Sequence, residues 1–377
     1  MKFKKYPFEK LNELLSGIKA NEEFTPVSLT IGEPQFETPQ FIKEALIKNI
    51  DLFNKYPKTA GELELKEAQL SYLKQRFGLN LELNQLIPTF GTRELLFNFP
   101  QFFLSGKKSP KVAYVNPFYQ IYEGAAIASG AEVVYLELNR ENSFKPQIDK
   151  EALKGVDLVI LNTPSNPTAS AMGLDELKQW AELALESDFV LLNDECYIDL
   201  YFNEPIPSIL NAAVEAGNSD FKNILTINSI SKRSSAPGLR SGFIAGDKEI
   251  LKEYLKYRTY VGCASPLPLQ HAAAVAWADQ THVEPFRAIY KQNLELARDI
   301  LGAEMPESTF YVWIEVEDAL NAAKKLYERY NVKVLPGEFL GRAGAGVGYW
   351  RLALVYEPDT TKEALERVAK FLSEWNK

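Results

Sequence analysis

Between residues 60 and 290 the sequence alternates between helical segments and short apolar runs, and this alternation constrains the fold more than any other feature. In residues 61–77, Leu65, Ala68, Tyr72 and Leu73 recur at intervals of three and four, which indicates an amphipathic helix. Short apolar runs bounded by turn residues predict buried strands. The runs are residues 112–115, 133–138, 158–161, 189–192, 224–227 and 243–245, and a helix such as 174–186 separates several of them. The pattern is typical of an α/β domain with a mostly parallel sheet.

The C-terminal part of the chain follows a different pattern. Residues 267–278, continuing to 300, indicate a long helix broken near Pro285. Further strands are expected at 310–316, 332–335 and 350–355, with helices at 319–330 and 362–375. The first 45 residues are too few to fold alone, so we expect them to pack on this second unit. We therefore predict a large domain of residues 46–290 and a small α+β domain built from residues 1–45 and 291–377.

Composition excludes several classes of protein. The 377 residues carry 42 basic and 50 acidic groups, and a net charge of -8 argues against a nucleic-acid or anionic-membrane binder. Two cysteines and two histidines are too few for a disulfide framework or a Cys/His zinc site, so we expect no metal. No run of 18 uncharged apolar residues and no signal-like segment occurs, so we expect a cytoplasmic protein.

Polar motifs follow several of the predicted strands. Asp194 comes after residues 189–192, and Asn166 lies in a Pro-rich turn after residues 158–161. Ligands in open α/β sheets bind at the carboxyl ends of strands, although a surface carboxylate or a plain turn would look the same. After residues 86–90, Thr92 is expected to cap a helix that begins near Arg93, and such a helix N-terminus attracts an anion.

The segment Ser229-Ile230-Ser231-Lys232 permits two interpretations. S-x-x-K is the nucleophile signature of penicillin-binding proteins and serine β-lactamases, but their S-D-N and K-T-G motifs are missing. Alternatively, the hydroxyls with Arg240 form a donor cluster suited to a phosphate ester. A neighbouring cation would also lower the pKa of Lys232, as a Schiff-base lysine requires.

The glycine-rich segment 341–348 resembles a phosphate-binding loop only superficially. It does not match G-x-G-x-x-G between a strand and a helix, because a strand-like run follows it. We interpret it as a flexible loop.

Taken in order, these motifs resemble the fold-type I, class I/II pyridoxal-phosphate (PLP) aminotransferases over nearly the whole chain. The resemblance implies an α/β aspartate aminotransferase-like PLP-transferase fold, with a mostly parallel central sheet sandwiched by helices and a small α+β domain built from both termini. Segments 193–202, 229–247 and 257–277 are similar to N-succinyl-diaminopimelate aminotransferases. The matching motifs are Gly32-Glu33-Pro34 with Thr38-Pro39, Tyr56 before Gly61, Gly91-Thr92, Asn116-Pro-Phe-Tyr119, Asn166-Pro-Thr, Asp194 with Tyr197, Ser229-x-Ser-Lys232, Arg240 and Arg351.

The resemblance assigns catalytic and ring-binding roles. Lys232 would form the covalent link to PLP and then move the proton between the substrate α-carbon and the cofactor. Asp194 would pair with the pyridine nitrogen and keep it protonated. Tyr197 and Asn166 would hydrogen-bond O3′ of the ring, and Tyr119 would stack on its face.

The resemblance also assigns phosphate and substrate contacts. Tyr56 would reach the phosphate from a second subunit, which implies a homodimer with shared active sites. Arg351 would bind the substrate α-carboxylate in a bidentate pair, with Gly32 and Asn166 nearby. Within one subunit, the phosphate would be held by Gly91, Thr92, Arg93, Ser229, Ser231 and Arg240.

Two positions depart from the family pattern. The usual N-P-T-G ends in Ala169 here, which implies that this turn needs no residue with positive φ. Phe90 stands where a hydroxyl residue often precedes the phosphate-binding glycine, so one phosphate contact is missing.

The resulting hypothesis is an aminotransferase that uses glutamate and 2-oxoglutarate as one pair and N-succinyl-2-amino-6-oxopimelate as the acceptor in lysine biosynthesis. Alternatives within the fold are an aspartate or other amino-acid aminotransferase, or a PLP β-lyase. A serine acyltransferase using Ser229, or a regulator with a DNA-binding domain, is disfavoured by missing motifs. Arg258, Arg342 and Lys333 are guesses for the distal carboxylates of the substrate.

Overall fold

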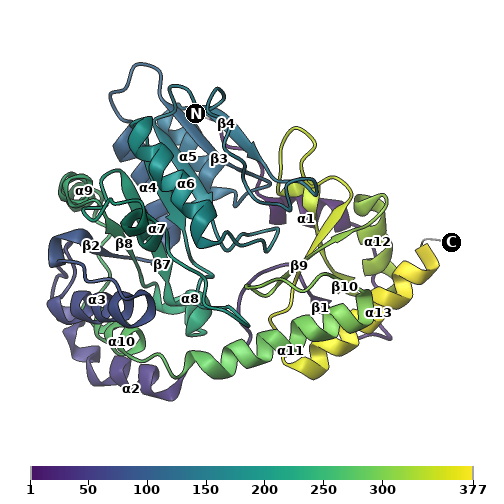
Figure 1. Cartoon of the computed structure of the whole chain (residues 1–377). Coiled ribbons are helices and arrows are strands. Elements are labelled where there is room, and N and C mark those ends of the chain that lie inside the picture. Colours follow the sequence, from purple (N-terminus) through teal and green to yellow (C-terminus); the bar gives the residue numbers. More distant parts are fainter. Residues whose placement is uncertain (1, 376–377) are drawn as a thin grey trace.

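A seven-stranded sheet forms the centre of the larger lobe in the computed structural model, which describes residues 2–375 (Figure 1). Its order is β2-β8-β7-β6-β5-β3-β4, and only β8 runs antiparallel to its neighbours. This confirms the predicted α/β fold with a mostly parallel sheet. The strands are β2 (Leu86–Thr89), β3 (Lys111–Asn116), β4 (Glu132–Glu137), β5 (Leu158–Asn162), β6 (Val190–Asp194), β7 (Ile224–Ser229) and β8 (Gly242–Gly246).

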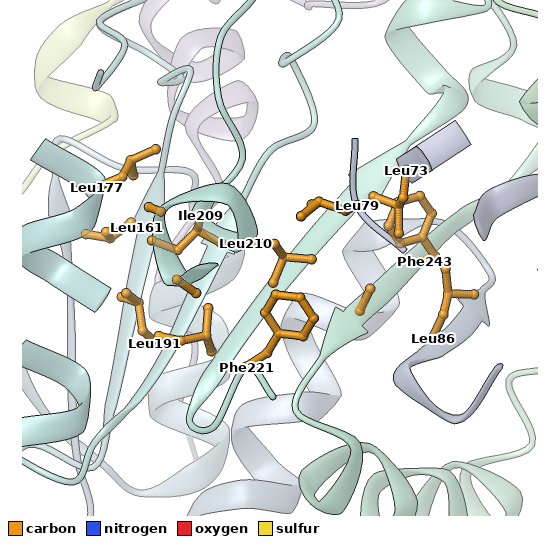
Figure 2. Close-up of a cluster of buried hydrophobic side chains, with 14 of the residues drawn as sticks. Leu73, Leu79, Leu86, Leu161, Leu177, Leu191, Ile209, Leu210, Phe221 and Phe243 are labelled. Carbon is orange, nitrogen blue, oxygen red and sulfur yellow. The ribbon is translucent and has the colours of Figure 1, made fainter. Parts of the chain in front are cut away.

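Helices cover both faces of this sheet, and alternating side chains of each strand serve one face or the other. In β5, Val159 and Leu161 join one apolar cluster, whereas Leu158 and Ile160 join another. Figure 2 shows part of the first cluster, where Leu161 and Leu191 of the sheet lie near Leu177. That face carries α3 (Leu63–Phe77), α6 (Leu174–Glu186), α7 (Ile209–Glu215) and α10 (Leu267–Ala278), and the other carries α4 (Thr92–Leu104), α5 (Ile121–Ser129) and α9 (Lys248–Val261).

A smaller lobe has its own apolar core. The antiparallel strands β11, β12 and β9 form one sheet, and β1 pairs in parallel with β10. The prediction of one strand at 332–335 was wrong, because the chain changes sheets there and makes two short strands. The elements are α1 (Pro7–Leu15), β1 (Val27–Ser28), β9 (Tyr311–Glu315), α12 (Ala319–Tyr330), β10 (Val332–Lys333), β11 (Leu335–Pro336), β12 (Tyr349–Ala353) and α13 (Pro358–Trp375).

Helix α11 (Val283–Leu301) runs from the end of α10 to the smaller lobe, where it packs beside α13 (Figure 1). The break between α10 and α11 lies at residues 279–282 and not at Pro285. Proline is tolerated in the first turn of a helix, whose N–H groups lack an intrahelical acceptor. Helix α2 (Gln40–Lys48) packs on α10. Residues 2–375 also contain four 3-10 turns: η1 (Ile50–Asn54), η2 (Leu83–Gln85), η3 (Pro237–Leu239) and η4 (Gly337–Phe339).

The division into domains at residues 46 and 290 stays a prediction. Within residues 2–375, no helix combines the length and the apolar character needed to cross a membrane.

Candidate active site

A cavity of about 550 Å³ lies where the carboxyl ends of β5, β6 and β7 face the smaller lobe. Parallel strands bring their carboxyl ends to one edge of a sheet, so Asn162, Asp194 and Ser229 all reach this cavity. The smaller lobe contributes Gly32 and Arg351. Most of the predicted site residues line it: Gly32, Thr92, Arg93, Tyr119, Asn166, Asp194, Tyr197, Ser229, Ser231, Lys232, Arg240 and Arg351.

Lys232 lies on a single helical turn, α8 (Ile230–Arg233), directly after β7. The Ser229 hydroxyl accepts from the backbone N–H of Ser231 at 3.2 Å and caps this turn. Lys232 Nζ donates to the carbonyl oxygen of Gly32 in the other lobe. Burial, together with the positive charges of Arg351 and Arg240, lowers the pKa of Lys232 to about 8. With a pKa of about 8, roughly a tenth of this amine is neutral and nucleophilic at pH 7, far more than for an unperturbed lysine.

Asp194 ends β6 and is held by two donors. Its Oδ2 accepts from the Tyr122 hydroxyl at 2.7 Å, and its Oδ1 accepts from the Cys196 backbone N–H at 3.2 Å. Burial raises the pKa of Asp194, and these hydrogen bonds partly oppose the rise. Tyr122 was missed in the sequence; it lies in the first turn of α5, and its ring packs edge-to-face on the Tyr119 ring with the ring centroids 5.8 Å apart.

A chain of hydrogen bonds links Asp194 to Arg351. Asn162 Nδ2 donates to the Asp194 carbonyl at 2.9 Å, and Asn162 Oδ1 accepts from the Asn166 backbone N–H at 2.8 Å. Asn166 Oδ1 in turn accepts from Arg351 Nη1 at 2.7 Å. Arg351 is only 4% exposed, also donates to the carbonyl of Thr30, and keeps its Nε without a partner among residues 2–375. Its guanidinium therefore retains donors for a ligand.

The turn after Asn166 corrects one prediction. Ala169 adopts φ 61°, so this turn does need a left-handed residue, and alanine occupies it without the freedom of glycine. The Ala169 N–H donates to the Ser165 carbonyl at 3.0 Å, which fixes that conformation.

The N-terminus of α4 supplies one end of the cavity. Gly91 is the N-cap with φ 72°, and a Cβ there would collide with the Arg240 guanidinium. Thr92 is the first residue of the helix and makes no side-chain cap, so the predicted Thr92 cap was wrong. The Ser229 and Ser231 hydroxyls lie 2.9 Å apart beside this helix end. Free helix N–H groups, two hydroxyls and a guanidinium together suit a phosphate group.

Aromatic hydroxyls border the rest of the cavity. Tyr119 OH accepts from Arg93 Nε at 2.8 Å, and Tyr197 OH lies 2.9 Å from Tyr311 OH. Burial raises the pKa of Tyr197 well above its usual value, so its phenol stays protonated and able to donate. Tyr311 was also missed, because nothing in strand 310–316 distinguishes it from a core aromatic.

Other predicted residues lie outside the cavity lining. Tyr56 is fully exposed, and its proposed contact with a second subunit stays a prediction. The three guesses for the distal carboxylates do not line this cavity either: Arg258 pairs with Glu94 at 2.8 Å, Arg342 pairs with Glu123, and Lys333 lies over the Tyr327 ring.

Comparison with known proteins identifies relatives of the whole chain. Residues 25–371 match the family described as aminotransferase class I and II. The crystal structure of aminotransferase AspB from Helicobacter pylori has a TM-score of 0.97 and 48% identity, covering 99% of this chain and 100% of that one. The 4-dedimethylamino-4-oxo-anhydrotetracycline transaminase OxyQ of Streptomyces rimosus is 31% identical over 348 residues, 91% of this chain and 92% of its own. An LL-diaminopimelate aminotransferase of Aquifex aeolicus is 29% identical over 358 residues, 91% of this chain and 90% of its own.

Proposed function

Because the chain belongs to the aminotransferase class I and II family, which is PLP-dependent, we propose that it transfers the amine of glutamate to N-succinyl-2-amino-6-oxopimelate. One observation carries the proposal: Lys232, Asp194 and Arg351 line the same cavity, although they lie far apart in the sequence. An amine nucleophile, a buried carboxylate and a carboxylate-binding guanidinium are the groups that amino-group transfer on PLP requires.

The residues of the cavity fit PLP. Asp194 is a buried carboxylate that faces the cavity, and a protonated ring nitrogen would supply the positive partner that a buried anion needs. The N-terminus of α4, with Ser229, Ser231 and Arg240, presents the donors that a phosphate group needs. The absence of a side chain at Gly91 lets the Arg240 guanidinium approach this helix end, where a Cβ would collide with it.

When bound, PLP supplies an aldehyde that links to amines and a ring that withdraws electrons from the substrate α-carbon. Lys232 provides the amine that holds the cofactor and, once displaced, a base that moves the proton at the substrate α-carbon. Asp194 would keep the ring nitrogen protonated, and the Tyr197 hydroxyl would donate to the ring oxygen. Arg351 orients the amino acid through its carboxylate.

The succinylated substrate is supported by the sequence. Four cationic side chains, Arg93, Arg240, Arg351 and Lys232, line the cavity, and each would serve PLP or the substrate α-carboxylate. The cavity charge therefore does not discriminate between substrates with one or several further carboxylates. Segments 193–202, 229–247 and 257–277 resemble N-succinyl-diaminopimelate aminotransferases, and a relative is named for LL-diaminopimelate.

We also propose a homodimer in which Tyr56 of each subunit completes the phosphate site of the other. The Tyr56 side chain is fully exposed and lies near other exposed apolar side chains of η1, including Ile50 and Phe53. Cytoplasmic location is part of the same proposal, and the free thiols of Cys196 and Cys263 are consistent with a reducing compartment.

The experiment that tests the substrate is a single-turnover measurement. Purified protein with bound PLP is mixed with N-succinyl-LL-diaminopimelate, LL-diaminopimelate or aspartate, and the change in cofactor absorbance is followed. Conversion at least ten-fold faster with the succinylated substrate supports the proposal. If aspartate or the free diaminopimelate reacts faster, the aminotransferase assignment stands and the substrate is wrong. Release of ammonia and pyruvate from cysteine would instead favour the β-lyase alternative.

A further inference from the structure

Behind the Lys232 turn, three side chains form a hydrogen-bonded series, which runs from buried Ser234 through His282 to the partly exposed carboxylate of Asp279. His282 Nδ1 lies 2.8 Å from Asp279 Oδ1, and His282 Nε2 lies 2.8 Å from the Ser234 hydroxyl. Ser234 is fully buried, and the edge of the His282 ring packs against Phe41. None of the three residues takes part in the proposed chemistry.

The protons of this series can be placed from the partners. Ionised Asp279 can only accept, so His282 Nδ1 carries a proton and donates to it. Burial and the neighbouring Arg233 cation lower the pKa of His282, which keeps the ring neutral. Nε2 of the neutral ring is therefore an acceptor, and the Ser234 hydroxyl donates to it.

The order Ser234, His282, Asp279 matches that of a hydrolase triad, but the surroundings do not. A nucleophilic serine must reach a carbonyl carbon of the substrate. Ser234 has no exposed surface and does not line the cavity that holds Lys232. The series therefore holds structure in place and does not attack a substrate.

One end of the series lies on the helical turn that carries Lys232, and the other lies on the crossing between the two lobes. Ser234 is the C-cap of α8, where its N–H donates to the Ile230 carbonyl at 3.0 Å, and it lies two residues after Lys232. Asp279 and His282 form the crossing between α10 and α11, which leads from the larger lobe to the smaller (Figure 1).

Neighbouring contacts anchor the same turn. Arg233 donates to the carbonyl of Ala276, in the last turn of α10, at 3.0 Å and to Gln280 Oε1, in the crossing that follows, at 2.6 Å. On the other side, the Ser235 hydroxyl donates to the Phe36 carbonyl at 2.7 Å. The residues after Lys232 thus contact both segments of the chain that cross between the lobes.

We propose that His282 is a positioning residue for Lys232: by accepting from Ser234 it holds the C-terminal end of the α8 turn against the α10–α11 crossing and so fixes the lysine amine in the cavity. The inference rests on the proposed role of Lys232. Without the Ser234 to His282 hydrogen bond, the C-terminal end of this single helical turn loses one of its anchors, and the amine samples more positions.

The test separates the two hydrogen bonds of the ring. An asparagine amide can occupy the place of Nδ1 and bind Asp279, whereas a glutamine amide can place its oxygen near Nε2 and accept from Ser234. The readout is the rate at which apoenzyme captures PLP, measured by borohydride trapping and recovery of the Lys232 peptide. We expect His282→Gln to keep the rate within two-fold, and His282→Asn and Ser234→Ala to lower it about five-fold, as for loss of one hydrogen bond. His271→Gln, which changes the chain's other histidine on the exposed side of α10, is the matched control and should leave the rate unchanged.

The outcomes distinguish this inference from the proposed function. If wild-type apoenzyme captures no PLP on Lys232, the proposed function fails. If wild type captures PLP and His282→Asn does so equally fast, or if His282→Gln is as slow as His282→Asn, the positioning role is refuted. Nitrogen-15 NMR of wild-type apoenzyme, assigned with the His271→Gln variant, gives a check that needs no change at His282. A neutral ring protonated on Nδ1 is expected, and a ring protonated on Nε2 overturns the inference.

Discussion

Replacing Arg351 by lysine tests the proposed carboxylate anchor most directly. A guanidinium has five N–H donors, and in the structure two bonds from Arg351 go to Asn166 and Thr30. Three N–H groups therefore remain for a bidentate contact with a carboxylate. A lysine ammonium has three donors in all, so it retains only one if it keeps the contacts with Asn166 and Thr30.

The expected loss follows from this count. One charge-assisted hydrogen bond contributes about 1.5–3 kcal/mol, so Arg351→Lys should raise KM for glutamate roughly ten- to 150-fold. PLP affinity should change little, because Arg351 lies on the side of the smaller lobe and not at the N-terminus of α4. Arg329→Lys, at a half-exposed arginine of α12, provides the matched control.

The assay compares steady-state kinetics with glutamate and PLP binding followed by absorbance. A glutamate KM within two-fold of wild type would show that Arg351 does not hold the α-carboxylate. A fall in PLP affinity as large as the rise in KM would instead place its role in forming the cavity.

Three further variants or conditions have definite expected outcomes. Tyr122→Phe removes a donor to Asp194, so the pKa of that carboxyl should rise further. We expect kcat to fall about ten-fold, the effect of losing one hydrogen bond to a charged group. An unchanged kcat would contradict this expectation. Gly91→Ala should weaken PLP binding at least ten-fold, because residue 91 has a positive φ and the added methyl would collide with Arg240. Titration of the apoenzyme with PLP measures the affinity, and an unaltered affinity would show that the turn relaxes. Only the neutral amine attacks an aldehyde, and the pKa of Lys232 is lowered to about 8, so PLP capture should rise with pH and level off above about 8. A rise that continues to pH 10 would mean that Lys232 titrates normally.

Local pattern predicted most of the architecture. The six apolar runs between residues 112 and 245 lie in strands of the large sheet to within one residue, and helices 174–186 and 319–330 have the predicted bounds. These features depend on periodicity within one segment, which the chain shows directly. The gathering of Asp194, Asn166 and Lys232 at one edge also follows from the general rule for parallel strands.

Contacts between distant segments decided the features of the fold and the site that the sequence did not predict. The antiparallel direction of β8 and the Tyr122 to Asp194 hydrogen bond depend on which surfaces meet after folding. No local pattern records these choices, because each depends on a partner that lies far away in the chain.

The sequence by itself determined the family, the order of elements and the side chains available for chemistry, since these depend on residue type and local spacing. Only the tertiary structure decided the pKa values and the positions of those side chains. Burial beside two arginines lowers the pKa of Lys232, and the crossing between the lobes places His282 behind its turn. Burial and electrostatic interaction depend on distance in space, and the folded chain alone sets that distance.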